Sequence, residues 1–261
     1  IRMSLADFFN IPEIRKLAQY IGGGSEGVYV SIEGGEEQEA YPLSYAQRRL
    51  WILCQFEEDS NAYNIPGVFM FDGPVRADIL EQAIKGLISR HEGLRTVFPT
   101  VKGEPLQQIV SHFPFTLPQT DLRHLDEAAK EAEGRRIFTD DANHVFDLEN
   151  GPLFLFRLVR MDDETYLFIF NIHHIVDDGW SQGVINTELF TLYNGFLKGR
   201  AAQDILPPLS LQYKDYSAWH NRLIETDHFA RLGTYWLEKF KDKPSGLELP
   251  VDFARPPIQT F

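Results

Sequence analysis

Two apolar runs near the middle of the chain have the length and residue types of buried strands. They cover residues 153–160 and 166–172, and Met161-Asp162-Asp163-Glu164 separates them. Runs of this length, rich in Phe, Leu, Ile and Val and joined by a short polar stretch, predict an antiparallel hairpin. The second run ends directly at two histidines. The pattern therefore predicts that the hairpin presents polar groups at a strand end.

Other segments have the spacing of helices. Ser44 is typical of a helix start, and residues 45–53 follow it with apolar positions on one face. Residues 75–90 place five apolar residues at helical spacing: Leu80, Ala83, Ile84, Leu87 and Ile88. Helical spacing also covers 125–138, 183–198 and 215–241, and extended segments are expected at 67–71, 94–98 and 106–110. Lys102-Gly103 predicts a hairpin turn before the last of these segments.

The stretch from His173 to Ser181 lies between the second strand of the hairpin and the helix 183–198. It reads His-His-Ile-Val-Asp-Asp-Gly-Trp-Ser. Gly179 allows the chain to turn, and Ser181 or an earlier polar residue is expected to cap the helix. Strand ends and the loops after them often carry chemistry in α/β proteins. We therefore take this stretch as the candidate site.

The residue types of this stretch allow more than one role. A neutral imidazole can accept a proton near pH 7, so His174 is a candidate general base. A neighbouring aspartate could orient the imidazole or pair with an arginine. Adjacent strand residues point in different directions, so one histidine should face the core and the other the solvent or a cleft. The alternative is a pair of purely structural histidines. A zinc site from His173, His174 and an aspartate is disfavoured, because the two rings diverge and no second Cys/His cluster exists.

Four blocks of sequence, in this order, carry a resemblance to a known family. They are Ser44–Leu53 (SYAQRRLWIL), Arg90–Phe98 (RHEGLRTVF), His173–Gly179 (HHIVDDG) and Tyr213–His220 (YKDYSAWH). They resemble the motifs SxAQxRLWxL, RHExLRTxF, HHxxxDG and YxDFAxWQ of the condensation domains of nonribosomal peptide synthetases. Tyr216, Ser217 and His220 depart from the last motif. The resemblance covers about residues 40–261.

This resemblance implies a fold and a reaction. The fold is α/β, one lobe of the chloramphenicol acetyltransferase type, with a mixed β-sheet and flanking helices. The family joins two carrier-bound substrates. The amine of an aminoacyl thioester attacks a peptidyl thioester and forms an amide. His174 corresponds to the catalytic histidine, acting as a base or by positioning the amine.

The resemblance also assigns supporting residues. His173 would support the site, and Gly179 would let the acyl thioester approach closely. Asp178 corresponds to the motif aspartate, which we expect to be structural and paired with Arg90 or Arg95. Trp219 is expected to pack the segment that crosses to a second lobe.

The same resemblance predicts the domain organisation. Residues 1–21 resemble the end of a carrier-protein domain, and 22–40, rich in Gly, Glu and Ser, form a linker. Residues 41–215 are the N-terminal lobe, and 216–261 are the crossover helix and the start of the connection to a C-terminal lobe. Ser25 is read as part of a turn, because it follows the helix and precedes Glu26. We expect a single-lobe fragment that is inactive on its own.

Composition limits the partners. The formal net charge of −13 over 261 residues argues against nucleic acid and anionic membranes as main partners. Cys54 is the one cysteine, which excludes an internal disulfide, and its apolar helical context predicts a buried, inert thiol. No signal peptide and no apolar run of about 18 residues is present, and we expect a cytoplasmic protein.

The expected partners are upstream and downstream peptidyl carrier domains and an adjacent adenylation domain. Substrates would arrive on the phosphopantetheine arms of the carriers, and no cofactor or metal would be bound directly. Three alternatives stay open. They are an epimerisation domain, which Trp180-Ser181 disfavours, a non-catalytic docking platform for carriers, and an acetyl-CoA acyltransferase.

Overall fold

The computed structural model describes residues 9–23, 31–56, 61–242 and 250–254. The chain divides into two compact units, Ile1–Glu33 and Gly34–Phe261. The first unit contains α2 (Ile14–Gly23), which runs through Gly22, a residue that the sequence analysis placed in the linker. Ser25 lies outside the described residues. The division between the units falls within the predicted linker 22–40, and the predicted domain boundaries stay a prediction.

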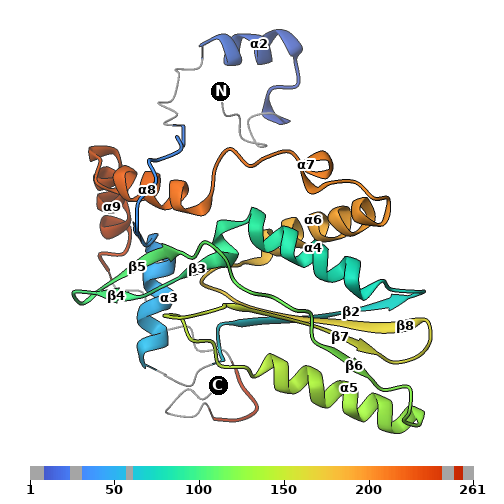
Figure 1. Ribbon diagram of the computed structural model, residues 1–261. Coiled ribbons are helices and arrows are strands. Elements are labelled where there is room, and N and C mark those ends of the chain that lie inside the picture. Colours follow the sequence, from blue (N-terminus) through green and yellow to red (C-terminus); the bar gives the residue numbers. More distant parts are fainter. Residues whose placement is uncertain (1–8, 24–30, 57–60, 243–249, 255–261) are drawn as a thin grey trace. The chain divides into compact units, whose positions relative to one another are not determined.

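A four-stranded sheet forms the centre of the second unit (Figure 1). Its order is β2 (Asn64–Asp72), β8 (Thr165–His173), β7 (Phe154–Arg160) and β6 (Gln119–Asp121). Strands β7 and β8 form the predicted hairpin, and β2 also pairs with β8 in antiparallel fashion. Strand β6 runs parallel to β7. The sheet is mixed, and helices flank it, as expected.

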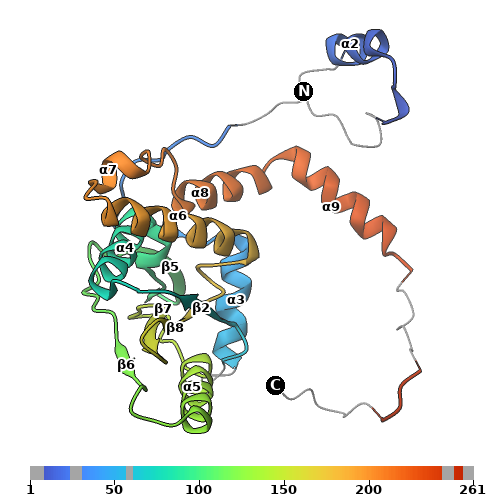
Figure 2. The same ribbon diagram turned by 90° about the vertical axis from the view of Figure 1, so that its right-hand side faces the viewer.

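Helices cover both faces of this sheet (Figures 1 and 2). Helices α4 (Ala77–Arg90) and α6 (Gly179–Leu197) lie on one face, and α5 (Glu127–Ala142) lies on the other. All five residues of α4 that the sequence predicted to face inward are buried. They belong to the largest apolar cluster, which contains five aromatic residues of the hairpin: Phe154, Phe156, Tyr166, Phe168 and Phe170.

Alternation along β8 decides which face each residue occupies. Phe168, Phe170 and Ile172 belong to the cluster under α4 and α6. Ile169 belongs to the cluster on the α5 face, and the amide nitrogen of Asn171 donates to the carbonyl oxygen of Asp141 in α5 at 2.8 Å. His173 is two residues further on, and it therefore continues the α5 face.

A smaller set of strands lies beside α3 (Tyr45–Phe56). Strand β5 (Glu104–Ile109) pairs with β1 (Tyr41–Pro42), β3 (Thr96–Val97) and β4 (Thr100–Val101). Lys102 and Gly103 connect β4 to β5 with φ of 54° and 86°, which confirms the predicted turn. The strand expected at 94–98 is shorter, because a 3-10 helix, η1 (Glu92–Arg95), occupies its first half.

The helical pattern of residues 215–241 belongs to two helices. They are α8 (Tyr213–Ile224) and α9 (Asp227–Lys239), and they follow the short α7 (Ala202–Ile205). Thr226 has an extended backbone and ends the continuity. Apolar residues at helical spacing are usually buried, but four of them in α9 and at its C-cap are exposed: Leu232, Tyr235, Trp236 and Phe240. Helical spacing shows that residues share a face, but it does not show what covers that face.

Within the described part of the chain, no helix combines the length and the apolarity that crossing a membrane requires.

Candidate functional site

His173, the last residue of β8, is a core residue. Only 3% of its surface is exposed. Its Nδ1 accepts a hydrogen bond from the backbone N–H of Ile175 at 3.1 Å, so the ring proton lies on Nε2, which faces Sγ of Cys54 at 3.7 Å. Burial, and then the neighbouring His174, lower the pKa of His173 to about 4. The imidazole is therefore neutral over the physiological range and has a supporting position.

His174 points away from the core. Its backbone N–H donates to the carbonyl oxygen of Tyr63 at 2.8 Å, which fixes the main chain where β8 ends. Its side chain is exposed, and Nδ1 lies 2.8 Å from the backbone carbonyl oxygen of Asp177. A carbonyl oxygen can only accept, so the Nδ1 proton is donated to it and Nε2 keeps a free lone pair. The predicted divergence of the two histidines is confirmed.

Asp178 caps the helix that follows. Its Oδ1 accepts hydrogen bonds from the backbone N–H and from the hydroxyl of Ser181, both at 2.8 Å. The helix starts at Gly179, four residues earlier than the predicted 183. The expected ion pair of Asp178 with Arg90 or Arg95 is wrong for the described structure. An exposed carboxylate at a helix N-cap is satisfied by the donors of the first turn and needs no arginine.

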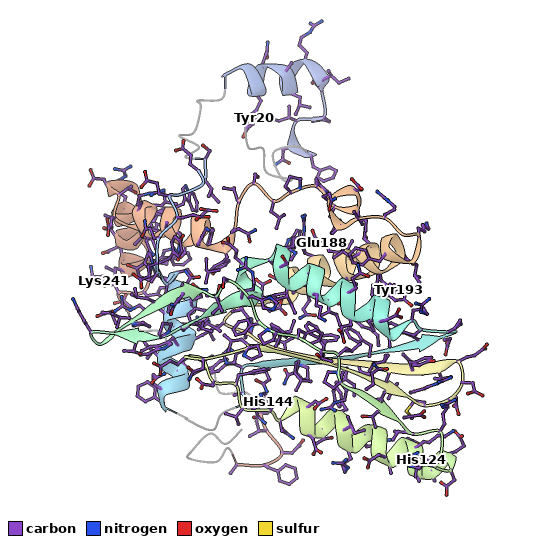
Figure 3. All side chains as sticks on the ribbon, in the orientation of Figure 1. Tyr20, His124, His144, Glu188, Tyr193 and Lys241 are labelled. Carbon is purple, nitrogen blue, oxygen red and sulfur yellow. The ribbon has the colours of Figure 1, made fainter. Side chains whose placement is uncertain are left out.

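Both arginines bind elsewhere. Arg90 donates to Glu188 of α6, with Nε to Oε2 at 2.9 Å and Nη2 to Oε1 at 3.2 Å, and also to the carbonyl oxygen of Pro207. Nε2 of His91 lies 2.6 Å from the carboxylate of the same Glu188, which is labelled in Figure 3. Arg95 donates to the carbonyl oxygen of Val110 at 2.7 Å. Arg90 therefore links α4 to α6, and it supports the site indirectly.

The exposed imidazole opens into a cavity of about 200 Å³. The loop 174–178 forms one wall, and Ala46, Arg49 and Leu50 of α3 form another, with Tyr213 of α8 beside them. Arg49 and Tyr213 belong to the first and fourth motifs, which are far from His174 in the sequence. Gly93, from the second motif, also lines the cavity, so the fold brings all four motifs to it.

Asp177 is a second acid in this cavity wall, and the sequence analysis gave it no role of its own. The side chain is buried, Oδ2 accepts a hydrogen bond from the amide nitrogen of Gln182, and Oδ1 has no hydrogen-bond partner among the described residues. Burial raises the pKa of Asp177 to about 6, although the Gln182 contact acts in the opposite direction. An apolar flank, here Ile175 and Val176, is the one sequence signal that could have indicated burial of this carboxyl group.

Helix α3 is held against the loop by its first turn. Ser44 and Gln47 form a reciprocal cap, with Gln47 N–H to Ser44 Oγ at 3.2 Å and Ser44 N–H to Gln47 Oε1 at 3.0 Å, which confirms the predicted cap. The amide nitrogen of Gln47 also donates to Gln107 Oε1 at 3.1 Å and to the carbonyl oxygen of Ile175 at 3.5 Å. The Ser44 and Tyr213 hydroxyl oxygens are 2.9 Å apart.

Gly179 and Trp219 are the two remaining residues that the sequence analysis assigned to the site. A Cβ added to Gly179 would meet nothing within 4 Å, so space is open above this residue. Trp219 lies on α8, where its ring is 5.9 Å from that of Tyr216 and 6.4 Å from that of His220. The roles predicted for Gly179 and Trp219 stay predictions.

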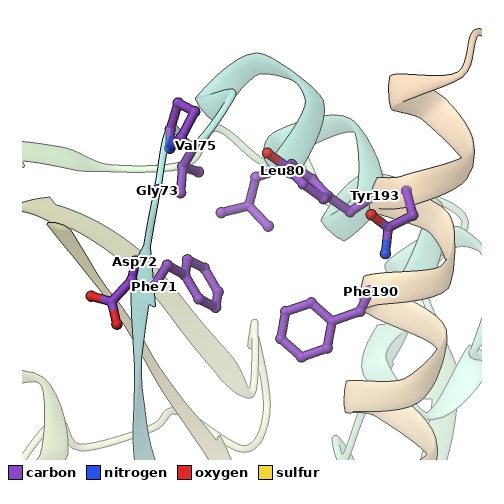
Figure 4. Close-up of a pocket in the computed structure, with 9 residues that line it drawn as sticks. Phe71, Asp72, Gly73, Val75, Leu80, Phe190 and Tyr193 are labelled. Carbon is purple, nitrogen blue, oxygen red and sulfur yellow. The ribbon is translucent and has the colours of Figure 1, made fainter. Parts of the chain in front are cut away.

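A second hollow has different chemistry. About 310 Å³ lies between the end of β2, α4 and α6, lined by Phe71, Leu80, Phe190 and Tyr193 among others. Figure 4 shows the rings of Phe71 and Phe190 facing one another across it, whereas the carboxylate of Asp72 points away. Asp72 pairs with Thr165, the first residue of β8, so this hollow lies at the other end of β8 from the histidines. Among the described residues, no group of three or more His, Cys, Asp or Glu side chains is arranged to hold a metal ion.

Comparisons with known proteins agree on one family. The family model described as "Condensation domain" matches residues 37–261. Gramicidin S synthase 2 from Brevibacillus brevis is 37% identical over 253 residues, which are 97% of this chain and 5% of the synthase. Bacitracin synthase 3 from Bacillus licheniformis is 38% identical over 256 residues, which are 98% of this chain and 4% of that protein.

Solved structures have the same fold. The X-domain in complex with OxyB from teicoplanin biosynthesis has a TM-score of 0.77 and 26% identity over 90% of this chain and 50% of its own. The first condensation domain of the calcium-dependent antibiotic synthetase has a TM-score of 0.70 and 23% identity over 80% of this chain and 49% of its own. The chain thus spans about half of these solved chains and only 4–5% of the two synthases.

Proposed function

Because this chain belongs to the family of condensation domains of nonribosomal peptide synthetases, we propose that it carries the histidine side of an amide-forming site. The substrates are a peptidyl or acyl thioester as donor and an aminoacyl thioester as acceptor. His174 acts on the amine of the acceptor. The observation that carries this proposal is the free Nε2 of His174, which opens into a cavity shared with residues of the three other motifs.

The geometry of His174 suits a base or a positioning group. The Asp177 carbonyl oxygen holds the Nδ1 proton, so Nε2 can accept a proton or a hydrogen bond from an amine N–H. The main chain of His174 is held as well, because its backbone N–H donates to the carbonyl oxygen of Tyr63. A fixed acceptor reduces the entropy that must be lost when the amine is oriented for attack.

The partners follow from the substrates. Peptidyl carrier domains upstream and downstream deliver both acyl groups on phosphopantetheine arms, which are parts of the substrates and not resident cofactors. An adenylation domain adjoins the acceptor carrier. The two synthases match 97% and 98% of this chain, beyond the 37–261 of the family model, which supports the proposal that residues 1–21 end a preceding carrier domain.

The test is a condensation assay on the synthetase polypeptide that contains this chain, with donor and acceptor loaded on their carriers. His174→Ala is expected to lower the rate of peptide formation at least 100-fold and to leave the melting temperature unchanged, because its side chain is exposed. His124→Ala removes an exposed histidine near α5 and is the matched control (Figure 3). Wild-type rates in the His174→Ala protein would refute the role of His174.

A non-catalytic docking role is the second candidate. One solved relative of this fold, the X-domain, is described in complex with a partner protein, OxyB. Titration of the chain with a carrier protein, with and without its loaded thioester, separates the two functions. Equal affinity for both forms together with no peptide product would favour docking, and product formation would favour condensation.

A further inference from the structure

Helix α3 presents one of its faces to the His174 cavity. Ala46, Arg49 and Leu50 line the cavity, and their spacing of three and four residues places them on one side of the helix. Gln47 also lines the cavity, and its amide nitrogen holds the helix to Gln107 and to the carbonyl oxygen of Ile175. The backbone position of Arg49 is therefore fixed relative to the loop that carries His174.

The two adjacent arginines of this helix differ in their partners. Arg48 binds Glu104, with Nη2 to Oε2 at 2.9 Å. Arg49 makes no hydrogen bond or ion pair with any residue in the described ranges, and it is exposed at the cavity. A guanidinium has five N–H donors. Those of Arg49 are available to a molecule in the cavity.

The acids of the cavity do not neutralise Arg49. The Asp178 carboxylate accepts both donors of Ser181, and Asp177 is buried with Oδ2 bound to Gln182. Among the described residues lining the cavity, Arg49 is the one arginine or lysine. An anionic oxygen beside His174 would therefore find one positively charged side chain in the cavity wall.

The proposed reaction generates such an oxygen. The lone pair of the acceptor amine forms a C–N bond with the thioester carbonyl carbon, and the C=O electron pair moves to oxygen. His174 Nε2 takes a proton from the nitrogen. When the C=O bond re-forms, the C–S bond breaks, and the thiolate leaves and takes the proton from His174. Stabilisation of charge on the carbonyl oxygen is a large contribution to catalysis of acyl transfer.

We propose that Arg49 is a catalytic residue whose guanidinium donates hydrogen bonds to the carbonyl oxygen of the donor thioester as negative charge develops there. This inference rests on the proposed function of the site. It assigns to the first motif a chemical role at the cavity in addition to the capping of α3.

The test measures binding of two probes, by calorimetry, to the complete condensation domain that contains this chain. One is a pantetheine-linked phosphonamidate, which is tetrahedral and carries a negative oxygen, and the other is the matching carboxamide, which is planar and neutral. The wild type is expected to bind the phosphonamidate roughly tenfold or more tightly than the carboxamide, since transition-state analogues gain at least that much. Arg49→Gln should abolish this preference without weakening carboxamide binding, and Arg48→Gln should retain it.

Distinct outcomes separate the two proposals. Carboxamide binding with no preference for the anion in the wild type, or an equal preference in Arg49→Gln, would overturn the role of Arg49 and leave the proposed function intact. Binding of neither probe by the wild type would overturn both. Melting temperatures of the variants check the fold, and an unchanged value is expected because both arginines are exposed.

Discussion

The guanidinium of Arg90, at the end of α4, binds both carboxylate oxygens of Glu188 in the middle of α6, at 2.9 and 3.2 Å. The two side chains are only 15% and 14% exposed, and His91 shares the same carboxylate. This contact joins the two helices that cover one face of the sheet. Helix α6 begins in the loop of His174, so the contact also fixes the helix behind the site.

Replacing Glu188 by alanine is expected to destabilise the fold by about 3–5 kcal/mol, because Arg90 would be left mostly buried without its charge partner. Urea unfolding followed by circular dichroism measures the change. Glu104→Ala is the matched control. It removes an exposed partner of Arg48 at a similar distance, and a loss below about 1 kcal/mol is expected. Equal losses in the two variants would show that burial of the Arg90–Glu188 pair makes no additional contribution to the free energy of unfolding.

Asp178→Ala is expected to cost about 0.5–2 kcal/mol, because α6 loses its N-cap. Asp178→Asn keeps a capping oxygen and should cost less. The backbone N–H of Ser181, and then its hydroxyl, lower the pKa of Asp178. The stabilisation is therefore complete above the unfolded pKa near 4 and is lost as the pH falls through the lower folded pKa. A wild-type and an Asp178→Ala protein that respond identically to acid would contradict this assignment.

Asp177 should have the opposite dependence on pH. Burial raises its pKa from 3.8 to about 6, so the folded state holds the proton more tightly than the unfolded state. Stability conferred by this group is present below pH 4 and is lost as the pH rises through about 6. The contribution of Asp177 to the free energy of unfolding is expected to fall by on the order of 3 kcal/mol between pH 4 and pH 7. Asp177→Asn should remove this loss and be more stable than the wild type at pH 7, as measured by thermal unfolding across pH 4–8. Lower stability of Asp177→Asn at pH 7 would count against a buried carboxylate.

The thiol of Cys54 is half-buried, and burial raises its pKa. We expect it to react with a disulfide reagent such as dithionitrobenzoate more slowly than free cysteine at pH 7, with the rate rising above pH 9. Because the chain has one cysteine, the released chromophore reports this residue alone. Reaction at the rate of free cysteine would indicate that the thiol is more accessible than the structure places it.

The sequence predicted those features that depend on local patterns. The hairpin of β7 and β8, the inward face of α4, the turn at Lys102 and the cap at Ser44 all follow from periodicity or from residue type. Strand alternation also predicted that one of the two histidines is buried and the other is not, and in the structure His173 is buried and His174 is exposed. These features need no knowledge of what packs against them.

Features that depend on a distant partner could not be predicted. Arg90 and Asp178 belong to consecutive motifs. The actual partner of Arg90 is Glu188, and only the packing of α4 on α6 identifies it. The capping of α6 by Asp178 removes the need for the arginine that the sequence analysis assigned to it. The exposure of α9 and the burial of Asp177 likewise depend on what lies across the fold.

Because side chains alternate between the two faces of the sheet along β8, the environment of each histidine depends on whether its position in the strand is odd or even. Ile169, Asn171 and His173 share one face, so inserting one residue between Asn171 and His173 would exchange the environments of the two rings. Two inserted residues would restore the faces but shift the pair beyond the contact with Tyr63. We therefore expect that the number of residues between the hairpin turn and His174 tolerates no gain or loss, whereas the Met161–Glu164 turn itself can vary.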